Sequence, residues 1–157
     1  MEAYFEWLQA LSFPRWIAES DSIWGFPFIL FLHSLGMGLS AGSAFVVSLR
    51  LLGVAAPLSV SSLRVIPQIF WAGFVLNFLT GSALFAAHAT QTGFIGIYYA
   101  KLALIAVGVV LFLPLGGFVD GPASDGPVPG RVKALAGLSI AVWVGVITTG
   151  RLIAYMG

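Results

Sequence analysis

Hydrophobic residues gather in four long runs along the chain, roughly residues 23–52, 65–87, 94–115 and 132–155. Each run exceeds the roughly 18 apolar residues that mark a transmembrane helix. Lipid offers no partner to backbone N–H and C=O groups, so a spanning segment must satisfy them internally, as a helix does. The alternating segments of about ten residues that build a β-barrel do not occur in the sequence. We therefore predict an all-α integral membrane protein with four spans.

The segments between the runs are short and rich in residues that favour turns. They cover residues 53–64, 90–93 and 120–130, and the last reads Asp-Gly-Pro-Ala-Ser-Asp-Gly-Pro-Val-Pro-Gly. Short connections make consecutive helices antiparallel neighbours. The pattern predicts that residues 21–157 form one four-helix bundle with up-down-up-down topology.

Residues 1–20 differ from the four runs because they combine acidic and aromatic side chains. The acidic start, with Glu2 and Glu6 and no basic region, is unlike that of a signal peptide. Trp7 and Trp16 are suited to a membrane surface, where amphipathic rings are most stable. We expect an interfacial amphipathic segment: a short helix, a break at Pro14, and a second helical stretch that enters the first span.

The composition agrees with a membrane protein and excludes several function classes. Only 8% of the residues are charged and 59% are hydrophobic, whereas a water-soluble domain carries about 25% charged residues. Seven basic residues against six acidic ones leave no basic patch, so we expect no nucleic-acid partner. The chain has no cysteine, which excludes disulfides, iron–sulfur clusters and thiol nucleophiles.

Basic residues give an orientation, because cytoplasmic loops carry an excess of Lys and Arg. The first and third connections are flanked by Arg50, Arg64, Arg131 and Lys133. The opposite side has Arg15, with Lys101 and Arg151 just inside helix ends. The first and third connections are therefore predicted to be cytoplasmic, with both termini outside.

Small residues inside the runs indicate close contacts between helices. The chain contains 19 glycines, and small residues let helices approach closely in lipid. Gly38 and Gly42 form a Gly-xxx-Gly pair in the first run. This face could pack against another helix of the same chain or dock another membrane subunit, and the pattern leaves both alternatives open.

Ionisable residues inside a bilayer are costly, so each calls for a functional hypothesis. His33 lies nine residues beyond Trp24, about 14 Å along the first helix. It shares a helical face with Gly36, Ser40 and Ser43, so this face is predicted to point into the bundle.

Three further polar residues gather toward the same side of the membrane as His33: His88, Lys101 and Arg151. Histidine can ligate haem iron, and Lys or Arg can pair with propionates. The four residues therefore suggest a cofactor site for a b-type haem, with His33 as ligand to the iron and no other cofactor expected. His33 and His88 differ in depth by about 10 Å if the helices are upright, which opposes ligation of one iron. A histidine that only forms structural hydrogen bonds, and proton or quinone handling, remain open alternatives.

Several short motifs resemble a family of small bacterial four-span inner-membrane proteins catalogued as a domain of unknown function. They are Trp16-Ile17-Ala18-Glu19-Ser20, Phe26-Pro27, His33-Ser34-Leu35-Gly36, Leu49-Arg50-Leu51-Leu52-Gly53, Trp71-Ala72-Gly73-Phe74, Thr80-Gly81, Lys101-Leu102 and the ending from Trp143 to Gly150-Arg151. The resemblance covers nearly the whole chain and implies that His33, Arg50, Lys101 and Arg151 occupy motif positions. An Asp often precedes the Leu-Arg motif in that family, whereas Ser48 stands there in this chain. His88 falls at a position that the family fills variably, and the family implies no activity.

The sequence supports two alternative hypotheses for the function. The first is a small integral-membrane subunit associated with electron transfer that binds a b-type haem through His33. The second is a non-catalytic accessory or scaffold subunit that packs beside a larger membrane complex. In either case we expect no catalytic activity of its own, with lipid and other integral membrane subunits as partners. A small transporter would be short at 157 residues unless several copies form a homo-oligomer. The expected location is the bacterial inner membrane, with both termini periplasmic.

Overall fold

The regular elements of the chain are all helical. The computed structural model describes residues 1–54 and 56–156, which contain no strand. The helices are α1 (Glu2–Ala10), α2 (Ser12–Glu19), α3 (Phe26–Leu52), α4 (Ile66–Ala87), α5 (Ala89–Thr92), α6 (Gly96–Asp120) and α7 (Gly130–Met156), with 3₁₀ turns η1 (Val60–Leu63) and η2 (Pro122–Asp125). The predicted all-α class is confirmed.

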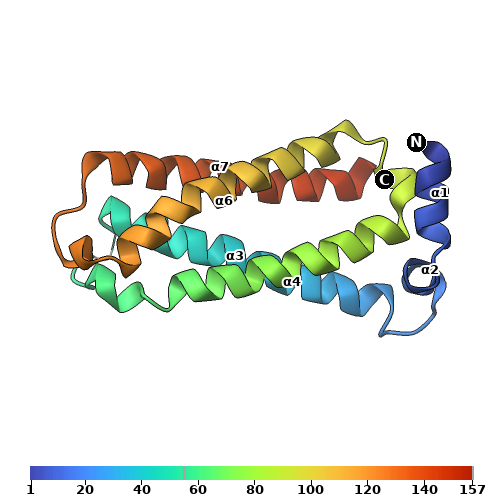
Figure 1. Cartoon of the computed structure of the whole chain (residues 1–157), viewed down its shortest axis with the longest axis horizontal. Coiled ribbons are helices and arrows are strands. Elements are labelled where there is room, and N and C mark those ends of the chain that lie inside the picture. The colour runs from blue at the N-terminus through green and yellow to red at the C-terminus, as the bar shows by residue number, and fades with distance from the viewer. Residues whose placement is uncertain (55, 157) are drawn as a thin grey trace.

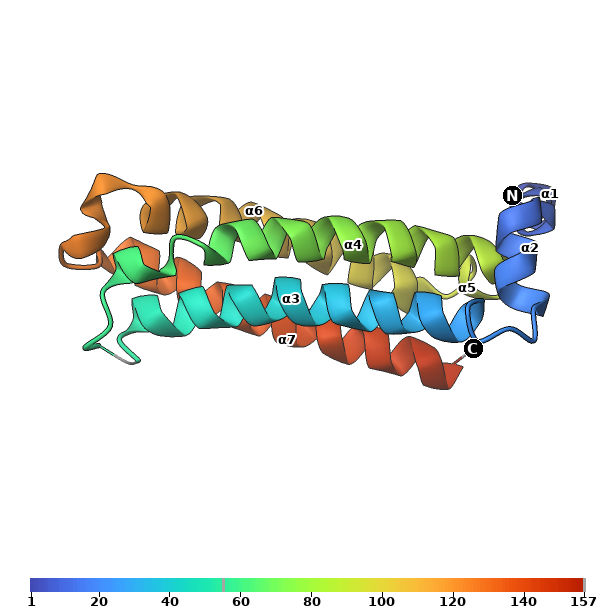
Figure 2. The same ribbon diagram turned by 90° about the horizontal axis from the view of Figure 1, so that it is seen from below.

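The four long helices α3, α4, α6 and α7 lie side by side, and the chain turns back after each of the first three (Figure 1). Helix α4 packs along α3, α6 packs along α7, and α3 also contacts α7. The turned view in Figure 2 shows the same long bundle, with η1 and η2 at one end and α1 and α2 at the other. All four helices are long and apolar enough to cross a membrane.

Large hydrophobic side chains cover much of the outer surface of the bundle. Examples are Phe78 at 63% exposed, Leu79 at 61% and Val110 at 63%. Soluble proteins rarely expose such extended apolar surfaces. This surface is suited to contact with lipid.

Local sequence explains where the spans begin and end. Pro27 and Pro67 lie in the first turns of α3 and α4, where a missing backbone N–H costs least. Gly53 ends α3 with φ +105°, a left-handed conformation that glycine adopts without a Cβ clash. Arg50 then donates hydrogen bonds to the carbonyl oxygens of Leu58 and Ala56 at 2.6 and 3.2 Å. Arg50 therefore holds the first connection in place.

The N-terminal segment differs in detail from the prediction. The break falls at Leu11, which is extended with ψ 146°, and not at Pro14, which lies inside the first turn of α2. Proline is tolerated there because the first N–H groups of a helix have no intrahelical partner. Helix α2 ends at Glu19, and residues 20–25 separate it from α3. The prediction that a second helical stretch enters the first span is therefore wrong.

Helices α1 and α2 lie across the end of the bundle (Figure 1, Figure 2) and are anchored to it. The buried Phe5 ring meets Phe85 and Phe94 edge to face, at centroid distances of 6.0 and 5.4 Å. The Thr90 hydroxyl donates to Oε1 of Gln9 at 2.7 Å. The segment thus caps one end of the bundle through specific contacts.

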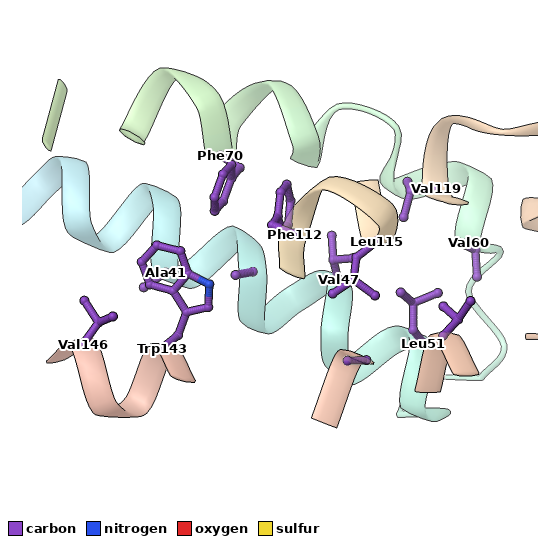
Figure 3. Packing of buried hydrophobic residues seen from close by; sticks show 13 residues of the cluster. Ala41, Val47, Leu51, Val60, Phe70, Phe112, Leu115, Val119, Trp143 and Val146 are labelled. Atoms are coloured by element: carbon purple, nitrogen blue, oxygen red, sulfur yellow. The ribbon is translucent and has the colours of Figure 1, made fainter. Parts of the chain in front are cut away.

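The apolar core occupies the other half of the bundle, toward η1 and η2 (Figure 3). At its centre the rings of Phe70 and Phe112 stack with centroids 3.7 Å apart, and Trp143 meets Phe70 edge to face. The core contains Ala41, Ala44, Val47, Leu51, Val60, Phe70, Phe112, Leu115, Val119, Val132, Ala136, Trp143 and Val146. The half of the bundle beneath the α1–α2 cap lies beyond this cluster.

The closest contact between two long helices involves glycines that the sequence analysis did not pair. A Cβ built on Gly36 would lie 2.7 Å from the backbone nitrogen of Asn77, and one built on Gly73 would lie 2.5 Å from Cβ of Leu39. Within the described residues, nothing comes within 4 Å of a Cβ on Gly38 or Gly42. The Gly38/Gly42 face therefore does not hold another helix of this chain, whereas its docking alternative stays a prediction.

Candidate functional site

His33 bridges α3 and α4 in the half of the bundle beneath the cap. Its Nδ1 lies 3.2 Å from the carbonyl oxygen of Asn77 and 3.2 Å from Oγ1 of Thr80. The Asn77 side chain donates in return from Nδ2 to the backbone carbonyl of His33 at 3.3 Å. The inward direction predicted for His33 is confirmed by these contacts.

The hydrogen bonds determine which ring nitrogen of neutral His33 carries the proton. A backbone carbonyl such as that of Asn77 can only accept. The Thr80 hydroxyl donates to the Leu76 carbonyl at 2.7 Å, so it acts as an acceptor toward His33. Nδ1 is therefore the protonated nitrogen, and Nε2 carries the lone pair. Within the described residues Nε2 has no hydrogen-bond partner.

Gly81 admits the imidazole to the surface of α4. A Cβ at position 81 would lie 3.0 Å from Cε1 and 3.3 Å from Nδ1 of His33. Any side chain there would push the ring away from its acceptors on α4. The Thr80-Gly81 pair thus supplies both a hydroxyl and the space that the ring requires.

Lys101 reaches the same region from α6. Its partly buried side chain lies along α7, where a Cβ on Gly150 would be 3.4 Å from Nζ. On α4, the Thr80 partner of His33 lies ten residues beyond Phe70 toward the cap. On α6, Lys101 lies eleven residues before Phe112, which stacks on Phe70, so His33 and Lys101 are at a similar depth in the bundle. Among the described residues the Lys101 ammonium has neither an ion-pair partner nor a hydrogen-bond acceptor. Lys101 therefore brings a donor-only positive group to the depth of an acceptor-only nitrogen.

The other two predicted site residues make contacts with aromatic side chains. The exposed Arg151 donates from Nη2 to the Tyr155 hydroxyl at 3.2 Å and lies over the Tyr155 ring. His88 follows the last residue of α4, and its ring packs against Phe26 at a centroid distance of 5.4 Å. The structure places His33 and Lys101 at a similar depth, whereas His88 and Arg151 contact Phe26 and Tyr155.

The positions of the two histidines do not fit one haem iron. His33 contacts α4 at Thr80, and His88 lies eight residues further along the chain, about 12 Å at the rise of a helix. Two imidazole nitrogens on one iron must both be within bonding distance of it, so this separation is too large. His33 alone keeps one feature of a haem ligand, an unpartnered Nε2 with Nδ1 held by a carbonyl.

The sequence alone did not connect Asn77 or Gly81 of the second span to His33. It assigned no role at all to the hydroxyl of Thr80. A polar Asn within an apolar run was a usable signal, because membrane helices use such side chains for interhelical hydrogen bonds. The relative register of α3 and α4 was not available from the periodicity of either helix.

Comparisons with protein-family models, curated proteins and solved structures find no match for this chain.

Proposed function

We propose that this chain is a small multi-pass integral-membrane subunit associated with electron transfer, with His33 as its functional group. The observation that supports this proposal is the fixed tautomer of His33, which leaves Nε2 without a partner in the described residues, at the depth of a Lys101 ammonium that is also unpaired there. Ionisable groups at membrane depth cost several kcal/mol and mark functional positions. A purely structural histidine would not require a second uncompensated group at the same depth.

The proposal includes an up-down-up-down arrangement in a bacterial inner membrane, with the resembled four-span family as the expected relatives. The end of the bundle at η1 and η2 carries Arg50, Arg64, Arg131 and Lys133, whereas the capped end carries Glu2, Glu6, Glu19 and Asp21. The excess of basic residues supports a cytoplasmic position for η1 and η2. Both termini would then lie in the periplasm.

Cysteine labelling tests this orientation. Cysteines at the exposed positions Ser62 and Ala123 are expected to resist an impermeant thiol reagent in intact cells, and a cysteine at the exposed Glu6 is expected to react. The chain has no native cysteine, so each signal comes from one site. Labelling of Ser62 and Ala123 variants but not of the Glu6 variant would reverse the orientation.

Purification from native membranes tests the link to electron transfer. In a mild detergent the chain is expected to co-purify with membrane subunits that show a reduced-minus-oxidised absorption band. The substitution His33→Asn keeps a donor where Nδ1 stands but removes Nε2. It should leave the complex intact while lowering the rate of quinol-driven reduction of that band at least tenfold.

A matched substitution and a second spectrum complete this test. Ser34 is exposed, and its hydroxyl donates to the Leu30 carbonyl within α3, so Ser34→Ala should leave the rate unchanged. A haem band in the isolated chain that disappears in His33→Asn would assign the haem to His33 alone. Absence of any redox-active partner or cofactor, or an unchanged rate in His33→Asn, would contradict the proposal.

The accessory-subunit alternative is favoured by the open face at Gly38 and Gly42. Nothing in the described residues covers these two glycines, and small residues permit close approach of another membrane helix. If a partner helix docks there, Gly42→Leu should release the chain from its complex while the chain stays folded. Native electrophoresis measures the release. A complex that survives Gly42→Leu would show that this face meets lipid.

A further inference from the structure

The described residues leave two complementary polar groups without partners in the same part of the bundle. Nε2 of His33 can only accept a hydrogen bond, because the proton is held at Nδ1 by Asn77 and Thr80. The Lys101 ammonium can only donate. The two residues come from α3 and α6 and lie at a similar depth beneath the cap. A molecule that satisfies both must carry a donor and an acceptor.

The Lys101 charge narrows the chemistry of that molecule. A lysine at membrane depth is stabilised by an anion or by strong acceptors, and no carboxylate is paired with it in the described residues, whose one salt bridge joins Arg15 to Glu19. A cationic ligand would be repelled by the ammonium. A ketone or ester would satisfy Lys101 but would offer no donor to Nε2. An acidic hydroxyl meets both demands, since it donates when protonated and becomes an anion when ionised.

The helix surfaces around His33 and Lys101 limit the chemistry of the rest of the ligand. The outer faces of the helices carry large exposed apolar residues, including Leu102 on α6 and Leu35 on α3. These surfaces suit an apolar tail that lies in the lipid while its head reaches inward. His33 and Lys101 themselves lie beneath the α1–α2 cap, outside the apolar core that fills the other half of the bundle.

We propose that His33 and Lys101 bind the acidic hydroxyl headgroup of an apolar-tailed, membrane-soluble molecule, either a quinol or a long-chain carboxylic acid. The ligand hydroxyl donates to Nε2 of His33, and its oxygen accepts from the Lys101 ammonium. When the O–H bond breaks, the proton forms an N–H bond at Nε2, and the ligand anion is stabilised by Lys101. No electron moves in this step. The inference rests on the proposed function only in taking His33 as the functional group.

Binding to the purified chain in a neutral detergent tests the proposal. Isothermal titration calorimetry would use a decyl-tailed ubiquinol and dodecanoic acid as probes, with dodecanol as a tail-matched control whose hydroxyl is not acidic. At least one acidic probe is expected to bind and dodecanol is not. His33→Asn and Lys101→Met are each expected to weaken that binding at least tenfold.

Two control variants distinguish loss of the site from loss of the fold. Ser34→Ala lies beside His33 in sequence, and Lys133→Met removes a lysine that is exposed in α7. Both should bind the acidic probe within twofold of the unchanged chain. His33→Asn retains a donor toward Asn77, so its thermal melt should stay close to that of the unchanged chain. If Lys101→Met fails to fold, the His33→Asn result alone decides the test.

Each outcome has a defined meaning. Binding of the quinol supports both this site and the proposed function. Binding of dodecanoic acid alone supports the site and identifies a lipid-derived ligand, which would remove the link to electron transfer. Equal binding by dodecanol, binding that His33→Asn leaves unchanged, or no binding of either acidic probe would overturn the inference.

Discussion

Replacing Gly73 by leucine is expected to prevent α3 and α4 from packing and to leave little folded protein. A Cβ at Gly73 would lie 2.5 Å from Cβ of Leu39 and 2.8 Å from the backbone nitrogen of Ser40. The obstructing atoms belong to the backbone or are attached directly to it, so no rotamer change can relieve the clash. Overpacking a filled site costs about 1–3 kcal/mol, and a leucine adds four carbon atoms. The free energy of unfolding should therefore fall by at least about 3 kcal/mol, the upper end of that range.

Thermal unfolding in detergent, followed by circular dichroism, measures this effect. Gly38→Leu is the matched control, because it adds the same side chain on α3, where nothing in the described residues lies within 4 Å. Its melting temperature should stay within a few degrees of that of the unchanged chain. A Gly73→Leu protein that melts normally would contradict the α3–α4 contact. An equal loss in Gly38→Leu would show that a second molecule covers that face.

The spans could be predicted from sequence because lipid imposes a single backbone solution on a long apolar run. The run at residues 65–87 became α4, Ile66–Ala87, almost without change. The third run was expected to end near residue 115, yet α6 continues to Asp120 past Pro114 and two glycines. Hydropathy falls at Gly116 and Gly117, but Gly116 is buried against Pro67 of α4. Tertiary packing therefore extends α6 beyond the residue at which its local composition predicts an end.

The candidate site could be predicted only in part, because position along a helix gives depth but not the neighbour that a side chain meets. The periodicity correctly placed His33 on an inward face. The partners of His33 on α4 are 44 and 47 residues away in sequence, and their identity depends on how two helices slide past each other. The same limit applies to Arg151, which has the expected position near the end of the fourth span but bonds to Tyr155 on its own helix.

The choice of glycines shows a related limit. Gly38 and Gly42 have the spacing of a known packing motif, but the structure uses Gly36 of α3 and Gly73 of α4. Gly36 and Gly38, both on α3, differ by two residues, which is about 200° around a helix of 3.6 residues per turn. Both faces contain small residues, so composition alone could not decide between them. The polar residues His33 and Ser40 lie on the same side of α3 as Gly36, and they mark that side as the one that packs inside the bundle.

Phe112→Ala is expected to destabilise the apolar half of the bundle strongly. The ring is 1% exposed and stacks on Phe70 with an interplanar angle of 16°. Removing it leaves a cavity between α4 and α6, where few other contacts join these helices (Figure 3). Truncation of a buried Phe costs about 3–5 kcal/mol. Because lipid is itself apolar, the loss is mainly one of packing, and we expect about 3 kcal/mol, the lower end of that range.

The measurement is again the free energy of unfolding in detergent, and Leu113→Ala provides the control on the next residue of the same helix. Leu113 is 54% exposed, so its truncation removes a side chain that meets lipid or detergent and should cost well under 1 kcal/mol, as for ordinary surface positions. The acidic probe should still bind to the folded fraction of Phe112→Ala, since His33 and Lys101 lie outside the core cluster. Equal losses for Phe112→Ala and Leu113→Ala would contradict the assignment of the core to this half. Loss of probe binding by folded Phe112→Ala would instead show that the apolar half positions the polar centre.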